Sequence, residues 1–427
     1  MRSLVLSGVA LQACVAATPT PPPSGPAQAA PAPGSTLASL HELKVELAPF
    51  RNSLKARAEA FGPELAPLVA EIGRRQKEGR SVSCSYQMYR ELRWRLSFTS
   101  DEPAVRARLK DLKDSLASDA DQSWADTQAP EDGSWGRCYK EWFMKTWASV
   151  ETLEDLAKSG KLPEAPLRFL DRVNSPELLT EYLRSVRASE IGRTGELTRV
   201  RADDSVSALG RLLLDGIAPP SFQFHGDLAG AYLQFLDDEW QNPATGMWGL
   251  WFVLPDGRTL KTDDTGITFH ILSQRRGQVK HKDRLARGML ALRGKDFPFG
   301  WRLNGHYENH LSWDAAKIFR YAWPYSPEAE RAEMAAEIQA TLDFSLKESL
   351  TDAGEFKTSD LDDTPGDAAE NGVSFLREVG YFDKSKRFWT SQTFPGAEEL
   401  RKKITQHLQS TGLVDPAFRR AYDMIGG

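Results

Sequence analysis

The sequence predicts an all-α protein in which helical hairpins form a single closed ring, an (α/α)6 barrel or toroid. Apolar residues recur at helical spacing and strand patterns are few. A glycine followed at once or two residues later by an aromatic residue or leucine also recurs, at intervals of 62, 51, 54 and 54 residues: Gly133-Ser-Trp135, Gly195-Glu-Leu197, Gly246-Met-Trp248, Gly300-Trp301 and Gly354-Glu-Phe356. A period near 54 indicates a stacked helical hairpin whose apolar face needs neighbours to cover it.

The chain begins with a short export-like segment, residues 1–14 (MRSLVLSGVALQAC), in which Arg2 and an apolar run precede Gln12-Ala13-Cys14. This resembles a bacterial lipoprotein box, although the segment is short and Gln12 is bulkier than usual. The resemblance implies export to the cell envelope and a membrane anchor on Cys14. The alternative is an unstructured cytosolic leader. Residues 15–36 are rich in Pro and Ala, which predicts a tether that holds a folded domain off the membrane.

The pattern of residues 37–78 predicts a helical lead-in, in the form of either a hairpin or a cap. Apolar positions keep helical spacing on both sides of Gly62-Pro63. The toroid is expected over residues 79–427. Gly79 lies 54 residues before Gly133, which brings the expected hairpins to six. An inner helix is expected after each glycine turn, the first at 86–96. More polar outer helices are expected at 104–116, 175–183, 282–292 and 327–346.

The segment from Phe235 to Trp248, with Gln241 and Gly246-Met-Trp248, resembles the glutamine-tryptophan repeat of terpenoid cyclases and protein prenyltransferases. Its spacing from Gln241 to Gly246 is one residue longer than the family pattern. Residues 344–356 form a weaker copy in which Phe356 replaces tryptophan and glutamine is missing. The resemblance implies a toroid over residues 79–390. In such toroids the glutamine and tryptophan tie neighbouring helix ends together.

Composition excludes several classes of protein. The net charge is −5 with both signs interspersed, so the basic stripe of a nucleic-acid surface is missing and no nucleic-acid partner is expected. No phosphate-binding glycine loop, nucleophile elbow or cysteine metal cluster is present, and no cofactor is expected. Cys84 and Cys138 remain besides Cys14. An even pair in an oxidising compartment predicts either a disulfide or two buried thiols.

The candidate site follows from the predicted ring. Because every inner helix begins just after its glycine turn, all inner-helix N-termini point to one mouth, where the polar residues at those starts meet. These residues are Asp203-Asp204, Asp263-Asp264-Thr265, the HYENH run 306–310 with Asp314, and the DLDDT run 360–364. Helix capping alone would account for Asp203, Asp204 and Thr265, whereas a second carboxylate at 263–264 exceeds what capping needs.

Two of these runs suggest particular chemistry. Residues 360–364 match the Asp-x-Asp-Asp-Thr signature of class II terpenoid cyclases, and that resemblance implies Asp362 as a general acid that protonates an alkene or epoxide. His306 and His310 share one helix face and could bind a metal together with Asp264 or Asp314. The alternative is two histidines hydrogen-bonded at a helix start, and the metal status stays open.

The same residues suit glycan chemistry. Tyr, His and Asn together can neutralise an acidic sugar, abstract a ring proton and protonate the leaving oxygen, as in (α/α)-barrel polysaccharide lyases, while a carboxylate pair could carry out hydrolysis. We expect catalytic roles for Asp362, Asp264, His306 and Tyr307. We expect substrate-binding roles for Asp263, His310, Asp363, Asp314 and Trp248.

Aromatic residues that could stack on sugar rings are Trp248, Trp251, Trp301, Trp313, Tyr321 and Trp323, and the arginines that could pair with uronates are Arg275, Arg276 and Arg302. The first expected function is an envelope lipoprotein that binds, cleaves or hydrolyses glycans. The alternatives are a non-catalytic envelope scaffold and an isoprenoid cyclase.

Overall fold

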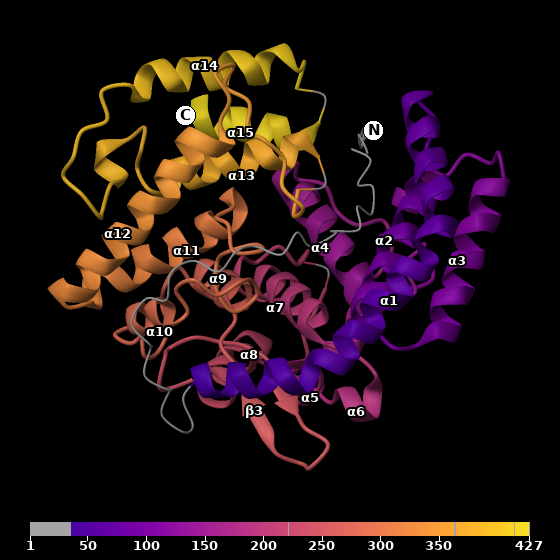
Figure 1. The fold of residues 1–427 in the computed structure, drawn as a ribbon. Helices are drawn as coiled ribbons and strands as arrows, with labels where there is room; N and C mark the ends of the chain where they lie inside the picture. Colours follow the sequence, from indigo (N-terminus) through magenta and orange to yellow (C-terminus); the bar gives the residue numbers. More distant parts are fainter. Residues whose placement is uncertain (1–35, 221, 363, 414, 427) are drawn as a thin grey trace.

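The protein is described by a computed structural model over residues 36–220, 222–362, 364–413 and 415–426 (Figure 1). Helices account for 62% of the structure and strands for 4%, so the fold is all-α, as predicted. The predicted lipidation of Cys14 and the tether of residues 15–35 lie outside the described residues. Among the helices that are described, none is both long and apolar enough to cross a membrane.

A helix follows each glycine-aromatic turn, as the period predicted. From α4 to α13 each of these helices packs against the next, and α15 (Pro416–Gly426) packs on α13. The six are α2 (Ser83–Phe98), α4 (Trp142–Lys158), α7 (Arg199–Leu214), α9 (Thr265–Gln274), α11 (Asn309–Ala322) and α13 (Pro365–Glu378). Helices far apart in the sequence, from α4 to α15, therefore pack side by side.

A second set of helices alternates with this series. Helix α5 has an apolar stripe of Leu179, Leu183 and Val186 and an otherwise polar surface, as expected for an outer helix. The alternating helices are α3 (Glu102–Ala117), α5 (Pro176–Arg187), α8 (Leu228–Gln234), α10 (Leu285–Ala291), α12 (Glu328–Phe344) and α14 (Ala397–Ser410), with the short α6 (Ile191–Thr194) between α5 and α7.

The lead-in is a single helix, α1 (Thr36–Lys77), so the expectation of a hairpin was wrong. Pro63 lies inside α1 and does not end it. The apolar stripe continues across the proline and is buried on both sides, with Leu43 and Leu47 in the main core and Phe61 and Leu65 against α2 and α3. That burial outweighs the backbone hydrogen bond that proline removes.

Three short strands lie just before inner helices. β1 (Ala188–Ser189) pairs in parallel with β2 (Trp251–Val253), which pairs antiparallel with β3 (Thr259–Lys261). Helix α1 contacts β3, and Arg258 beside that strand makes a 2.6 Å ion pair with Glu42 of α1. The sequence pattern did not predict this sheet. It reinforces the end of the molecule where α7 and α9 begin.

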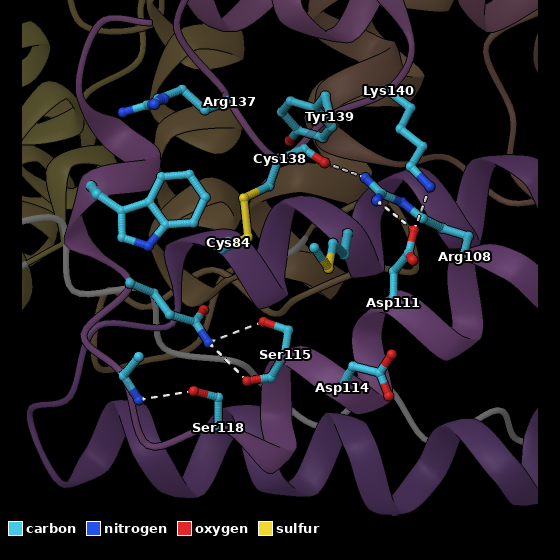
Figure 2. Close-up of a pocket in the computed structure, with 14 residues that line it drawn as sticks. Cys84, Arg108, Asp111, Asp114, Ser115, Ser118, Arg137, Cys138, Tyr139 and Lys140 are labelled. Atoms are coloured by element: carbon cyan, nitrogen blue, oxygen red, sulfur yellow. Dashed lines mark hydrogen bonds and ion pairs between the residues drawn. A yellow bond between two sulfur atoms is a disulfide. The ribbon is translucent and has the colours of Figure 1, made fainter.

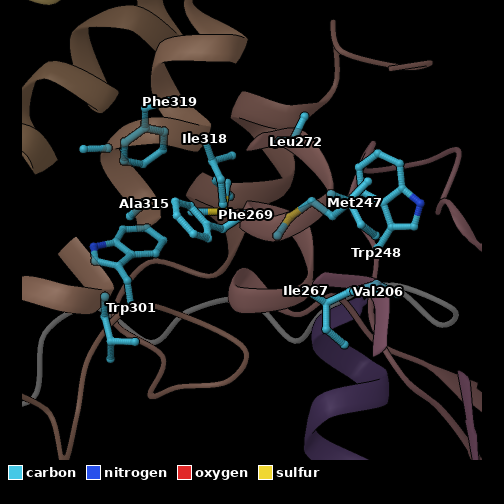
Figure 3. Packing of buried hydrophobic residues seen from close by; sticks show 14 of the residues in the cluster. Val206, Met247, Trp248, Ile267, Phe269, Leu272, Trp301, Ala315, Ile318 and Phe319 are labelled. Atoms are coloured by element: carbon cyan, nitrogen blue, oxygen red, sulfur yellow. The ribbon is translucent and has the colours of Figure 1, made fainter. Parts of the chain in front are cut away.

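The main core fills the space between α7, α9 and α11 (Figure 3). Val206, Ile267 and Ile318 come from these three helices, and each is fully buried. The turn tryptophans Trp248 and Trp301 are also in this core and expose at most 1% of their surface. The aromatic residue of each glycine turn therefore anchors the turn to the helix that follows.

A glutamine braces two of the turns in the same way. Residues 128–135 (QAPEDGSW) and 241–248 (QNPATGMW) share the pattern Gln-x-Pro-x-x-Gly-x-Trp. In each copy the glutamine Nε2 donates to the carbonyl of its own turn glycine, at 2.9 and 2.8 Å. Each glutamine Nε2 also donates to a second carbonyl further along the chain. Gln128 donates to the Ala165 carbonyl at 2.9 Å, and Gln241 donates to the Lys280 carbonyl at 2.7 Å. Of these two copies, only the second was expected from the sequence.

Candidate functional site

Charged side chains meet around Arg199, in the first turn of α7. The guanidinium makes two contacts with Asp264, Nε to Oδ2 at 3.0 Å and Nη2 to Oδ1 at 3.1 Å. Its Nη1 lies 3.2 Å from Asp203, one turn further along α7. The ring of Phe297 lies 4.4 Å from the guanidinium carbon. Arg199 therefore joins the beginnings of α7 and α9.

Asp264 is also the N-cap of α9, since its Oδ1 accepts a 3.0 Å hydrogen bond from the Ile267 N–H. Burial raises the pKa of Asp264, and Arg199 opposes that shift. Capping does not account for Asp203 and Asp204, because α7 begins at Arg199 and both carboxylates lie inside it. Thr265 is likewise not the cap, and its hydroxyl donates to the Phe299 carbonyl at 2.8 Å.

Two histidines face the same interior. His270 on α9 places Nε2 3.8 Å from Oδ1 of Asp203, and its side chain keeps 30% exposure. His310 lies in the first turn of α11. Burial lowers the pKa of both imidazoles, while nearby carboxylates, chiefly Asp203 for His270 and Asp362 for His310, oppose the shift. Both rings are therefore neutral at pH 7 and can accept or relay a proton.

Asp314 lies one turn beyond His310 and exposes only 2% of its surface. Its Oδ1 has no hydrogen-bond partner among the described residues. Burial, followed by the charges of Asp203 and Glu308, raises the pKa of Asp314 well above its usual range. Burial and Asp203 likewise raise the pKa of Asp204 to about 7. Burial and like charges therefore favour the protonated form of both carboxyls.

The beginnings of α11 and α13 meet beside these residues. Glu308 caps α11 through the Leu311 N–H at 2.9 Å and accepts the Ser359 hydroxyl at 3.1 Å. Burial raises the pKa of Glu308, and Asp362 adds to the shift. Asp362 accepts hydrogen bonds on both oxygens, from the Ser359 N–H at 2.7 Å and from Asn371 Nδ2 at 2.9 Å. Asp363 lies outside the described residues.

We call this group the acid–histidine cluster. It brings together four residues expected from the sequence, Asp264, His310, Asp314 and Asp362, with others that were not expected to act. Its members are Arg199, Asp203, Asp204, Asp264, His270, Glu308, His310, Asp314, Lys317 and Asp362.

His306 and Tyr307 do not join the cluster. His306 is exposed in the turn before α11. The Tyr307 hydroxyl lies 3.2 Å from Arg302 and donates to Glu337 of the outer helix α12, also at 3.2 Å. The chain turns between Tyr307 and Glu308, so neighbouring residues point to opposite sides of α11.

Asp263 and Trp248 stabilise the turn that leads into α9. Asp263 is fully buried and accepts hydrogen bonds from Asn242 Nδ2 and Thr245 Oγ1, both at 3.0 Å. The indole N–H of Trp248 donates to the Leu236 carbonyl at 2.8 Å. Neither side chain faces the interior where a substrate would lie, so the adjacent acids Asp263 and Asp264 have different surroundings.

Trp313 is the aromatic residue that lies beside the cluster. It sits between His310 and Asp314 in the sequence of α11, is half-buried, and packs edge-on against Phe269 with ring centroids 5.2 Å apart. The ammonium of Lys317 lies 5.9 Å from its ring. By contrast, Trp251 is covered by Arg187 and Lys261, at 3.7 and 4.0 Å.

Three members of the cluster were not expected from the sequence, namely Arg199, His270 and Lys317. The spacing indicates two of them, because Arg199 precedes Asp203 by four residues and Lys317 follows Asp314 by three, which places each on the same helix face as its acidic neighbour. Within the described ranges, no group of three or more His, Cys, Asp or Glu side chains is arranged to hold a metal ion.

A separate cavity of about 540 Å³ lies beside a disulfide (Figure 2). Cys84 at the start of α2 is bonded to Cys138 before α4, with Cα atoms 5.3 Å apart. The two cysteines are separated by 54 residues, so they occupy equivalent positions in successive repeats. Trp124 and Arg137 form one wall of the cavity. The charged groups around it are largely paired with one another.

No protein-family model, curated protein or solved structure matches this chain. The fold and the cluster together define an all-α protein with a buried group of acidic and histidine side chains.

Proposed function

We propose that the protein is a glycoside hydrolase whose active site is the acid–histidine cluster. The observation that carries this proposal is Asp314, a buried carboxyl with an unbonded oxygen and a strongly raised pKa, close to carboxylates that contact Arg199. Hydrolysis of a glycosidic bond needs one protonated carboxyl and one carboxylate on opposite sides of the bond.

In this mechanism Asp314 donates its proton to the glycosidic oxygen as the bond from that oxygen to the anomeric carbon breaks. A water molecule attacks the anomeric carbon and gives a proton to Asp203. His270, 3.8 Å from Asp203, then passes that proton to solvent, and Asp314 takes up a proton from solvent to restore the starting state. Arg199 holds Asp203 and Asp264 in place. Trp313 offers a face on which a sugar ring can stack.

Hydrolysis fits the site better than lyase chemistry. A lyase must neutralise the carboxylate of an acidic sugar, and two of the three arginines expected for that role have other partners. Arg275 pairs with Asp237, and Arg302 contacts Tyr307. The Tyr307 and His306 pair expected to move the ring proton also lies away from the cluster.

The two alternative functions fit less well. A scaffold would leave the acids as separate caps with ordinary pKa values, whereas burial and like charges raise the pKa of Asp204, Glu308 and Asp314. An isoprenoid cyclase would use Asp362 as the acid. Both Asp362 oxygens accept hydrogen bonds, which suits a carboxylate rather than a proton donor.

The proposal includes a closed toroid that resembles those of terpenoid cyclases and prenyltransferases. Two observations support it. The glutamine-tryptophan bracing occurs twice, and the partners of Asp203 and Asp204 come from both sides of α7, namely His270 on α9 and Arg90 on α2. It also includes export and a lipid anchor on Cys14, which the lipoprotein-like N-terminus and the disulfide support.

The test is hydrolysis of a panel of neutral, amino and acidic polysaccharides by the full chain, measured as new reducing ends. We expect cleavage of at least one polysaccharide, and a loss of activity of about 100-fold or more in Asp314→Asn. The matched control is Asp343→Asn on the outer helix α12, where the side chain is 44% exposed. No cleavage of any polysaccharide, or full activity in Asp314→Asn, would refute the proposal.

A further inference from the structure

The acid–histidine cluster contains more negative than positive groups. Its cations are Arg199 and Lys317, and Arg90 of α2 adds a third beside Asp204. Its two imidazoles are held neutral. The acids are Asp203, Asp204, Asp264, Glu308, Asp314 and Asp362.

Two further acids lie at the edge of the cluster, and neither offsets its excess of negative groups. Glu370 of α13 forms its own two-pronged pair with Arg420 of α15, at 2.8 and 2.6 Å. Glu151 of α4 adds one more negative charge near Asp204. Four acids in this interior have raised pKa values, and for Asp204 and Asp314 the charge of Asp203 is the largest contribution after burial. The protein itself therefore supplies too few cations to hold all these acids ionised.

Asp314 adds an independent observation that points to a ligand. The residue is 2% exposed, and its Oδ1 makes no hydrogen bond within the described part of the chain. A buried oxygen without a partner costs about 1–3 kcal/mol, and native proteins keep few of them. Asp314 lies one turn from His310 and close enough to Asp203 and Glu308 for their charges to act on it. The unbonded acceptor is therefore part of the same interior.

We propose that this interior binds the protonated amine of an amino sugar, so that the substrate is a glycan with free amino groups rather than an acidic or fully acetylated one. This inference rests on the proposed hydrolase function and specifies its substrate. The ammonium supplies the missing positive charge and three N–H donors, and the unbonded Asp314 oxygen accepts one of them. Half-buried Trp313, in the same turns of α11, stacks on the sugar ring.

Binding of an ammonium has a consequence that binding of a neutral sugar lacks. A cation placed among carboxyls favours their ionised forms, so the complex releases protons from Asp204, Asp264 and Glu308, while Asp314 keeps the proton that hydrolysis uses. The groups that respond face the site from every helix around it: Arg90 on α2, Glu151 on α4, Arg199, Asp203 and Asp204 on α7, Asp264 and His270 on α9, Glu308, His310, Asp314 and Lys317 on α11, and Asp362 before α13.

Calorimetry on the full chain at pH 6 tests the proposal with three probes, the tetramers of glucosamine, N-acetylglucosamine and galacturonate. We expect glucosamine tetramer to bind at least 10-fold more tightly than its acetylated counterpart, and galacturonate tetramer to bind most weakly. Titrations in two buffers with different ionisation enthalpies should show proton release with glucosamine tetramer only. Asp314→Asn should lower the affinity for that tetramer about 10-fold, whereas Asp343→Asn should not change it.

The possible outcomes separate the two proposals. Equal affinity for the amino and acetylated tetramers, or proton uptake on binding, would overturn the amino-sugar inference, while cleavage of another glycan would leave the hydrolase proposal intact. If no glycan is bound or cleaved, both fall. The comparison among the three probes needs only the unmodified protein, so it holds even if Asp314→Asn fails to fold.

Discussion

Asp203 and Asp204 are adjacent on α7 but have different partners. Asp203 lies 3.2 Å from Arg199 and 3.8 Å from His270. Asp204 faces the other way, toward Arg90 and Glu151. The direction in which a side chain leaves the helix therefore decides its chemistry. The same holds for Asp263 and Asp264, of which the first braces a turn and the second joins Arg199.

We predict that Asp204→Asn stabilises the protein increasingly as pH rises. Burial raises the pKa of Asp204 from 3.8 to about 7, so between pH 4 and pH 7 the folded state keeps a proton that the unfolded state has lost. The wild type therefore loses stability across this window. Asparagine needs no proton, and its advantage should grow from near zero at pH 3 to at most about 4 kcal/mol at pH 8.

Urea unfolding at several pH values measures this difference. Asp343→Asn should show the opposite trend, because Lys347 and Gln339 lower the pKa of Asp343 and its contribution to stability is lost as pH falls. A pH-independent difference between Asp204→Asn and wild type would contradict the prediction.

At the scale of elements, the glycine turns decide where each inner helix begins. Gly246 has φ +74°, and a Cβ there would lie 2.5 Å from the His281 carbonyl oxygen. The turn therefore needs glycine for its backbone angle and for the close approach of another chain segment. Together with the buried tryptophans and the glutamine hydrogen bonds of the turns, this requirement explains why the glycine turns recur at a recognisable interval in the sequence.

We predict that Gly246→Ala lowers the free energy of unfolding by roughly 3 kcal/mol or more, since alanine adds a backbone clash to the strain of a positive φ. Gly257→Ala is the matched control. Gly257 has φ +83°, and a Cβ there would meet no described atom within 4 Å, so its substitution should cost about 1 kcal/mol. Chemical denaturation measures both, and equal losses would show that the close approach at Gly246 is unimportant.

At the scale of the whole molecule, α1, α2 and α3 form their own core beside the main one. Three features join the two cores. They are the long helix α1, the disulfide between Cys84 and Cys138, and the ion pair of Arg95 on α2 with Glu141 before α4, at 2.5 Å. Asp203 and Asp204 of α7 have partners beside both cores, namely His270 on α9 and Arg90 on α2. The acid–histidine cluster therefore depends on the attachment of α1, α2 and α3 to the main core.

We predict that the double variant Cys84→Ser with Cys138→Ser loses about 4 kcal/mol of stability, because the bond closes a loop of 54 residues in the unfolded chain. Guanidinium unfolding measures the loss, and adding a reductant to wild type should reproduce it. A loss below about 1 kcal/mol would mean that the other contacts hold the two cores together without the bond.

The sequence by itself determined the helical class, the positions of the helices that follow the glycine turns, and the helix beginnings at which Asp264, His310 and Asp362 lie. These depend on local rules, namely helical periodicity, glycine at positive φ and N-capping. Tertiary structure decided which side chains at those beginnings share an interior. It set His306 and Tyr307 apart, buried Asp263 and Trp248 in a turn, and added Arg199, His270 and Lys317. The direction in which a side chain leaves its helix, and its burial by distant segments, depend on packing across the whole chain. Spacing along the sequence does not give this information.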